Sequence, residues 1–227
     1  MTTSATPSGV RSDHVVVPPD AATADGASLA FDNGLERLRL RSEEHLDAML
    51  EARFGEPLPV MWAAENTIHV EYPLGARLLR RAQPSAILLN PAPAWSFDVH
   101  GGATHLDADL SLTRLRAVSI HSGLALSRLV LGRPAGERVI RLSSVKQLRI
   151  ERPADIPVRI ELANGATDVS LDNRRYGAFG NRLTDRTPGY DTAENRYLLI
   201  ASAAVDGLTI THRGRPQRRG AGKPHPR

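Results

Sequence analysis

The chain has 227 residues, enough for one large domain or two small ones, and its 41% apolar and 24% charged residues are ordinary for a soluble globular protein. It contains no cysteine, which excludes disulfides and thiolate metal sites, and only 4% aromatic residues, so the core must be aliphatic. The net charge of +4 arises at the C-terminus, because removing the six Lys and Arg residues that follow His212 leaves −2 for residues 1–211.

The N-terminal segment, residues 1–25, is rich in Thr, Ser, Ala, Pro and Asp, and we expect it to be mostly disordered. Its three consecutive valines, 15–17, could add an edge strand that the following prolines would end. The segment has no basic stretch followed by an apolar one, and no apolar run approaches the roughly 20 residues of a membrane helix. We therefore expect a cytoplasmic protein with no transmembrane segment.

One helix is predicted over residues 43–54. Ser42 is a suitable N-cap, two glutamates follow in the first turn, and Gly55 stands where a helix would end. The apolar residues between them recur at helical spacing: Leu46, Met49, Leu50 and Phe54.

Most of the remaining chain alternates between apolar and polar residues, as half-buried strands do. The stretches 68–72, 95–99 and 158–162 are the clearest examples. A small residue then follows each strand at a regular distance, with a second alternating stretch after it. Gly165, for instance, is followed by Val169 and Leu171. The small residues that we assign to equivalent corners are Gly34, Gly102, Ala125, Ser144, Gly165 and Ala204.

These corners are separated by 23, 19 and 21 residues between positions 102 and 165. A period near 20 built from short strands predicts an all-β, β-solenoid-like stack, here a single domain over residues 26–211 followed by a disordered basic tail, 212–227. Small residues fit such corners because the backbone must bend there and successive corners pack on one another. The repeat therefore specifies a fold and not a catalytic loop.

From about residue 27 to residue 210 the chain resembles an actinobacterial group of proteins with toast-rack, or adhesin-like, domains, which are similar to the C-terminal domain of regulators of the cell-envelope-stress response. The stretches that carry the resemblance are the corners HGGATHL, GLALSRLVL, SSVKQLRI, NGATDVSLD and SAAVDGLTI. The resemblance implies a regulatory or scaffolding role through protein contacts, and no enzymatic activity or cofactor. Three corners depart from the glycine-containing pattern, at 124–125, 143–144 and 203–204.

Two sets of side chains are candidates for chemical sites. His100, His105 and His121 fall near successive corners, and three imidazoles would suit zinc. Their spacing matches no known ligand pattern, and exposed turn residues explain them equally well, so we predict no metal site. Asp107 and Asp109 share one face of a strand, as acids do in β-helix enzymes that cleave sugars, but a solvated strand face is the simpler interpretation.

Two segments are candidates for contacts with partners. The long polar stretch 172–195 carries residues that could form a cationic, aromatic surface for a partner protein: Arg174, Arg175, Tyr176, Arg182 and Tyr190. The alternative is a loop packed on the side of the stack. The tail could contact polyanions through Arg213, Arg215, Arg218, Arg219 and Lys223, or could simply be a solubilising terminus.

The sequence contains no nucleophile elbow, P-loop or dinucleotide-binding motif. We therefore predict a non-catalytic interaction or scaffold protein that binds a protein partner and needs no cofactor. A homodimer through open strand edges is compatible with this fold. The alternatives are a carbohydrate-active β-helix enzyme and a nucleic-acid-associated protein that acts through its tail.

Overall fold

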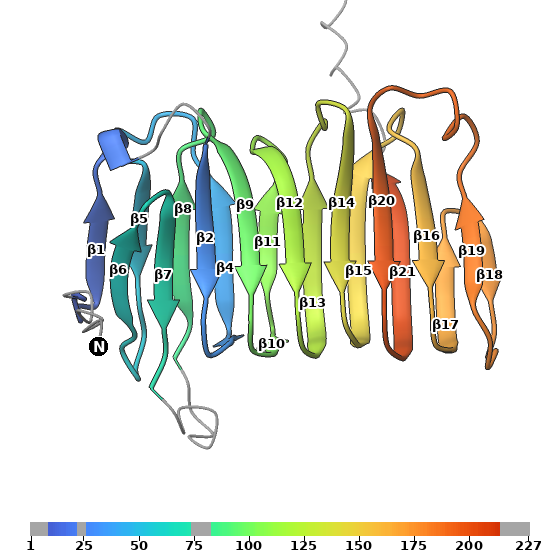
Figure 1. Cartoon of the computed structure of the whole chain (residues 1–227), viewed down its shortest axis with the longest axis horizontal. Helices are drawn as coiled ribbons and strands as arrows, with labels where there is room; N and C mark the ends of the chain where they lie inside the picture. The colour runs from blue at the N-terminus through green and yellow to red at the C-terminus, as the bar shows by residue number, and fades with distance from the viewer. Residues whose placement is uncertain (1–8, 22–25, 74–82, 214–227) are drawn as a thin grey trace, which may run out of the picture.

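The computed structural model describes residues 9–21, 26–73 and 83–213, which form two long β-sheets stacked face to face (Figure 1). The nine-stranded sheet runs in the order β19 (Leu183–Arg186), β16 (Val158–Leu162), β20 (Arg196–Ala201), β14 (Glu137–Leu142), β12 (Arg114–Ile120), β9 (Ala94–Val99), β2 (Ala27–Phe31), β7 (Thr67–Glu71) and β6 (Val60–Ala64).

The second sheet has twelve strands among the described residues. Its main order is β1 (His14–Val17), β5 (Leu50–Arg53), β8 (Ser85–Leu89), β4 (Leu38–Ser42), β11 (Asp107–Leu110), β13 (Leu124–Leu131), β15 (Val145–Pro153), β21 (Val205–Arg213), β17 (Ala166–Leu171) and β18 (Arg174–Tyr176). The short strands β3 (Leu35–Glu36) and β10 (Ala103–Thr104) complete it. In the described ranges, the helical content is one 3-10 turn, η1 (Pro19–Ala21), and no helix is long and apolar enough to cross a membrane.

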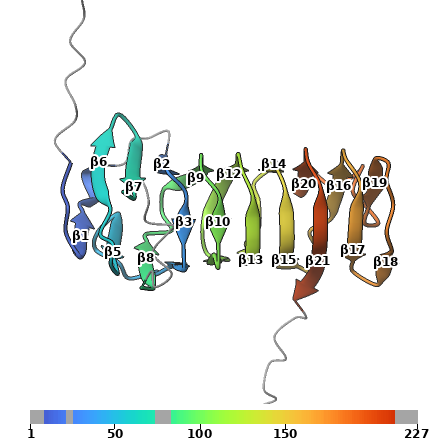
Figure 2. The ribbon, with the colours of Figure 1, turned by 90° about the horizontal axis from the view of Figure 1, so that it is seen from below.

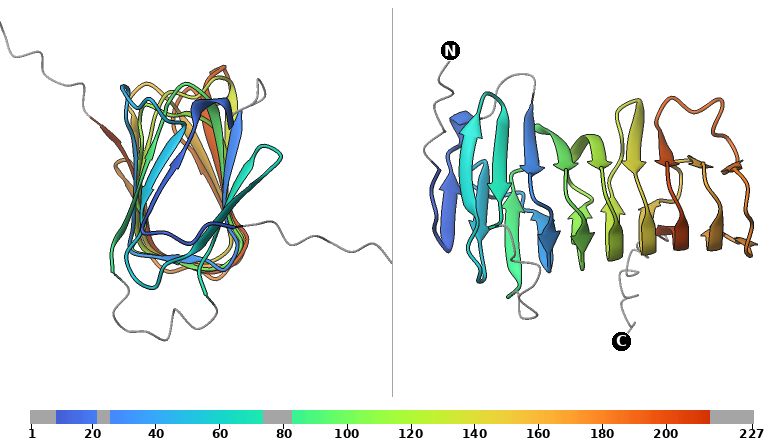
Figure 3. Two further views of the ribbon diagram at one scale, coloured as in Figure 1. Left: turned by 90° about the vertical axis from the view of Figure 1, so that its left-hand side faces the viewer. Right: turned by 60° about the horizontal axis from the view of Figure 1, so that its bottom comes forward.

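Six segments of the chain follow the same path, which we call a rung. Each rung contributes a strand to the nine-stranded sheet, turns through two or three residues, runs briefly along one narrow side, bends, and continues into the twelve-stranded sheet (Figure 3). Neighbouring rungs pair in parallel in both sheets, with Val99 opposite Ile120 in one and Ala108 opposite Leu129 in the other. The predicted all-β, solenoid-like stack is thereby confirmed.

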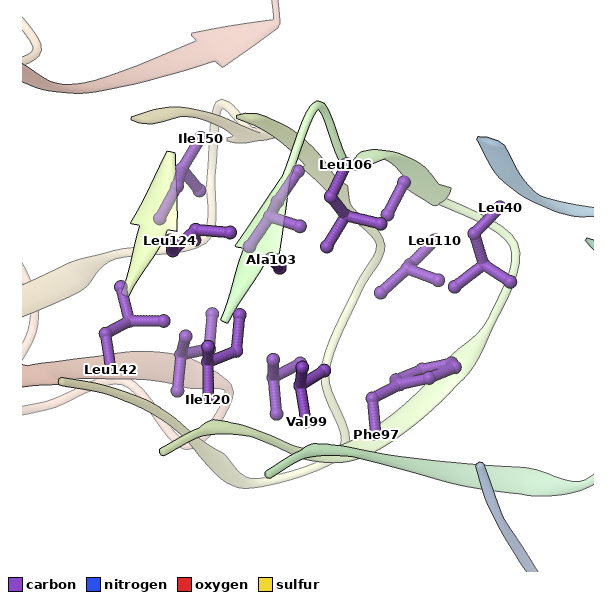
Figure 4. Packing of buried hydrophobic residues seen from close by; sticks show 14 of the residues in the cluster. Leu40, Phe97, Val99, Ala103, Leu106, Leu110, Ile120, Leu124, Leu142 and Ile150 are labelled. Carbon is purple, nitrogen blue, oxygen red and sulfur yellow. The ribbon is translucent and has the colours of Figure 1, made fainter. Parts of the chain in front are cut away.

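The core lies between the two sheets because alternate residues of every rung point inward. Val158, Ile160 and Leu162 of β16 are buried, while the residues between them are partly exposed. Figure 4 shows aliphatic side chains from the two sheets meeting in this space, with Val99, Ile120 and Leu142 on one side and Leu110, Leu124 and Ile150 on the other. Burial of this continuous and mainly aliphatic core, which also holds the aromatic side chains of Phe31, Trp95 and Tyr197, supplies the main stabilisation of a stacked fold.

Each rung bends at a residue with left-handed backbone conformation. The equivalent residues in the six rungs are Arg37, His105, Leu126, Gln147, Gly207 and Asp168, with φ between 50° and 73°. At the bend, two residues separate consecutive inward side chains instead of one, as between Val145 and Leu148. The extra residue turns the strand while both flanking apolar residues still face the core.

The small corner residues lie three positions before these bends. Backbone amides of adjacent rungs donate to the carbonyl oxygens of Gly102, Gly123, Ser144, Ala204 and Gly165 in turn. Ala125 was therefore assigned wrongly, because the equivalent corner is Gly123, two residues earlier. The cause is Ser127, a buried polar residue at an inward position that is aliphatic in other rungs; its hydroxyl donates to the carbonyl of Ala125 and accepts from the amide of Leu106.

The first and last rungs of the chain lie one layer in from the ends of the stack. β2 is flanked by β7 and β9, and β20 is flanked by β14 and β16, with matching arrangements of β4 and β21 in the other sheet. Figure 2 shows β21 inserted between β15 and β17. The interval of 39 residues between the corners at 165 and 204 is doubled because the segment with β18 (Arg174–Tyr176) and β19 (Leu183–Arg186) lies between β17 and β20 in the chain.

The predicted helix over residues 43–54 is wrong. Residues 43–49 form turns, and Leu50–Arg53 is β5, which pairs antiparallel with both β8 and β1. Leu50 and Ala52 point into the core and Phe54 is buried, so Leu50 and Phe54 fit an alternating pattern, whereas Leu46 and Met49 lie in the preceding turns. Pairing with the otherwise open edge of β8 outweighs local helix propensity.

Antiparallel strands cover both ends of the parallel stack. At one end these are β6, β5 and β1; β1 forms within the N-terminal segment that was expected to be mostly disordered and includes the three valines. At the other end they are β18 and β19. Residues 1–8 and 214–227, which fall within the two predicted disordered segments, lie outside the described residues.

The left-handed bend predicts a specific response to substitution at Leu126. Leu126→Val should lower the free energy of unfolding by about 1–2 kcal/mol, because a β-branched side chain is strained at φ 50°, whereas Leu126→Gly should not destabilise the protein. Urea denaturation of the full chain measures both changes. Leu112 is a matched control, since it is equally exposed at 47% but does not have positive φ, so Leu112→Val should be nearly neutral. Equal losses at the two positions would contradict the role of the bend.

Candidate functional site

A groove of about 690 Å³ runs along the narrow side of the stack where the rungs bend. Its floor consists of the small corner residues Gly123, Ser144, Ala204 and Gly165, and Phe179 lies at one end. The corner residues leave the space open because they carry almost no side chain. Glycine is favoured at position 165, since its φ is 59° and an added Cβ would make a tight contact, 3.1 Å, with the carbonyl oxygen of Phe179.

The outward residues of the narrow side form the wall of this groove. Ala125, Lys146, Asp206 and Thr167 occupy equivalent positions in four successive rungs. The hydroxyl of Thr167 donates to Asp206 at 2.7 Å. The groove therefore offers a mainly apolar floor with one basic and one acidic side chain along it.

The outer face of the twelve-stranded sheet carries a row of alternating charges. Asp107 forms ion pairs with Arg41 and with Arg128, and Arg128 also donates two hydrogen bonds of 3.1 Å to Glu151. Arg149 extends the row by pairing with Glu151 at 3.0 Å. These arginines hold the pKa of Glu151 below its usual value, chiefly through the hydrogen bonds from Arg128.

Asp107 and Asp109 do share a strand face, but they do not form an acid–base pair. Asp107 is engaged by two arginines, and Asp109 accepts a hydrogen bond of 3.0 Å from the amide of Ser111. Hydrogen bonds from Arg41 help to keep the pKa of Asp107 below its usual value, against the opposing effect of burial. A carboxyl group with a lowered pKa is poorly suited to act as the general acid of a glycosidase.

The segment 172–195 forms the cap at one end of the stack, and most of its candidate contact residues are engaged by other residues of the chain. Arg174 pairs with Asp185 at 2.7 Å, Tyr176 also hydrogen-bonds Asp185, and Arg182 pairs with Glu161. Arg175 is exposed on β18.

Tyr190 is a structural residue in this cap. It is 5% exposed, its hydroxyl donates to Glu137, and the guanidinium of Arg196 lies 5.1 Å from its ring centre. Burial, together with the hydrogen bond to Glu137, raises the pKa of Tyr190 to about 12.

Two of the three candidate histidines lie together, and the third does not. His100 and His121 stack with ring centres 5.1 Å apart, and both face Asp98, a residue that sequence reasoning did not include. His105 lies at the bend on the other side of β10. The 21-residue interval between His100 and His121 equals that between their corners, Gly102 and Gly123, and could have indicated the pairing.

Of the proposed polyanion contacts, Arg213 falls within the described residues. It ends β21 and donates a hydrogen bond of 2.9 Å to the carbonyl of Leu131. Arg215, Arg218, Arg219 and Lys223 lie outside the described residues.

No known family model and no curated protein matches this chain. Among solved structures, it is similar to a protein from Clostridium sporogenes ATCC 15579 described as a "putative cell adhesion protein". The TM-score is 0.61 over 92% of this chain and 100% of the other, at 16% sequence identity. The likeness shows a shared fold.

The row of charges predicts a pH-dependent contribution of Glu151. A carboxylate with a lowered folded-state pKa stabilises the protein above its unfolded pKa, and this stabilisation is lost as the pH falls through the folded value. Glu151→Gln should therefore lower the free energy of unfolding by about 1 kcal/mol at neutral pH, and the difference from wild type should shrink below about pH 4. Denaturant titrations across this range measure it. In an Arg128→Gln background the same substitution should show a weaker pH dependence, retained in part through Arg149, and an unchanged dependence would contradict the assignment.

Proposed function

We propose that this chain is a non-catalytic interaction protein that binds a partner protein along the groove on its narrow side. The observation that carries the proposal is the groove itself, which has an open, mainly apolar floor across consecutive rungs. It crosses β10, β13, β15, β21 and β17, so it spans about 19 Å, the length of roughly six extended residues. The shared fold with a protein described as a "putative cell adhesion protein" supports an interaction role.

The narrower parts of the proposal rest on the sequence alone. A regulatory role in envelope-stress signalling follows from the family resemblance, and a cytoplasmic location from the sequence expectation; both stay predictions. The exposed Arg175 on the end cap could add to a protein contact. Edge-to-edge dimerisation stays a prediction as well, but at one end of the stack the edge strands β18 and β19 are short and carry charged residues, which discourages pairing there.

The groove predicts which substitutions should abolish partner binding. Ala125→Arg and Thr167→Arg place a long charged side chain on its wall, and each should lower the recovery of partners at least about tenfold by obstructing a central contact region. The measurement is affinity purification of the full chain from its native cells, quantified by mass spectrometry.

A charge-matched control is Thr211→Arg, which lies on the outer face of the twelve-stranded sheet beside Glu151. It should leave partner recovery unchanged. All three variants must retain the circular dichroism and thermal midpoint of the wild type. Recovery of the same proteins at wild-type levels with both groove variants would refute the proposed site.

The basic tail leads to a separate expectation. Residues 214–227 contain five Lys and Arg residues and no acid, so any binding of double-stranded DNA should be electrostatic. If all five contact phosphates, the logarithm of the binding constant should fall with the logarithm of the salt concentration with a slope of about −4.5. Deleting 214–227 should abolish this binding, as measured by fluorescence anisotropy at two salt concentrations. Retention of the full affinity by the truncated chain would exclude the tail as the contact.

A further inference from the structure

Asp98, His100 and His121 form one compact cluster where two central strands of the nine-stranded sheet end. His100 follows β9 and His121 follows β12, and these strands pair in parallel with Val99 opposite Ile120. The two histidines therefore project from equivalent positions on adjacent rungs. Their rings lie 5° from parallel with centres 5.1 Å apart.

Asp98 lies on β9, two residues before His100, so the side chains of the two residues project from the same face of the sheet. One carboxylate oxygen lies 2.7 Å from Nε2 of His121 and the other lies 3.6 Å from Nε2 of His100. One ligand atom from each of the three residues falls within 4.8 Å of the others, a grouping that the described part of the chain contains once.

These separations fit a tetrahedral metal ion. Zinc binds imidazole nitrogen and carboxylate oxygen at about 2.0–2.1 Å, which places neighbouring ligand atoms about 3.3 Å apart. The two distances to Asp98, each measured to a different carboxylate oxygen, lie below and above this value. No two of the three ligand atoms are more than 4.8 Å apart, which is about 1.5 Å more than the separation in a tetrahedral zinc site. Rotation of the half-exposed side chains can close this difference.

The backbone that carries the three ligands is fixed by the neighbouring rungs. The amide of His100 donates to Phe31 at 3.0 Å, the amide of His121 donates to Val99 at 2.9 Å, and Asp98 lies within a strand that is paired on both sides. The side chains remain accessible, with 50% of His100, 53% of His121 and 40% of Asp98 exposed. A metal ion would therefore keep at least one coordination position open to water or to an incoming ligand.

We propose that Asp98, His100 and His121 bind one Zn²⁺ ion per chain. Imidazole ligands favour zinc and its neighbours in the transition series, whereas Mg²⁺ and Ca²⁺ require oxygen ligands. The proposal is independent of the groove and of the partner assigned to it.

A second histidine–aspartate pair in the same sheet serves as an internal control for this cluster. At the same edge, His69 pairs with Asp32 at 3.0 Å, and its ring stacks on Trp62 with centres 4.9 Å apart. This pair offers one imidazole and one carboxylate, and the indole covers one face of the imidazole. A two-ligand pair of this kind provides a control for weak, non-specific binding.

The test is zinc titration of the full chain by isothermal calorimetry, with Co²⁺ absorption as a second readout of tetrahedral coordination. Wild-type protein should bind one Zn²⁺, and His100→Ala, His121→Ala and Asp98→Asn should each weaken binding at least about tenfold. Zinc should raise the thermal midpoint of the wild type and not that of the variants. Mg²⁺ and Ca²⁺ should produce no comparable heat.

His105→Asn and Asp32→Asn are the matched controls. The first removes an exposed histidine outside the cluster while tolerating φ 55°, and the second alters the neighbouring His–Asp pair. Both should bind zinc as the wild type does. Absence of zinc binding at millimolar concentration would overturn the proposal. So would stoichiometric binding that survives in His100→Ala and His121→Ala, or that is lost equally in His105→Asn.

Discussion

The architecture depends on one backbone conformation repeated at the same place in every rung. A single left-handed residue turns an extended chain onto a new side of the stack and keeps the apolar residues before and after it pointing inward. Such a conformation is unfavourable for most residue types, yet five of the six rungs use a residue other than glycine. Hydrogen bonds between adjacent rungs continue through the bend, as from Arg37 to Thr104 and from His105 to Ala125, so each bend is held by its neighbours.

The sequence indicated the fold because the same physical requirement recurs in each rung. Alternation identified the strands, and small residues before each bend identified the period. It could not show that the first and last rungs insert one layer inward, since nearest neighbours in a stack are not encoded by interval length. Two predictions from the sequence were wrong. The corner of one rung was placed two residues too late because the buried Ser127 stands where other rungs have an aliphatic residue. A helix was predicted where the chain forms β5, because pairing with the edge of β8 outweighs the helical pattern.

Candidate site residues could be predicted from the sequence where the rung period fixes their positions, and could not be predicted elsewhere. Once the period is known, the interval between His100 and His121 places them on adjacent rungs, whereas His105 lies beyond the corner and faces elsewhere. Asp98 joins them because a carboxylate two residues earlier on a strand leaves the same side. The cationic residues of 172–195 could not be interpreted from sequence, because their acidic partners Asp185 and Glu161 approach only when the segment folds back as a cap.

The inward placement of the last rung has a consequence for biosynthesis. β16 and β17 emerge from the ribosome before β20 and β21, yet the later pair separates them from β14 and β15 in the finished protein. The pairing of β16 with β20 and of β17 with β21 can therefore be complete only after the last described strand has been made. The edges of β14, β15, β16 and β17 that pair with β20 and β21 lack these partners while residues 172–213 are being made, and unpaired strand edges favour misfolding.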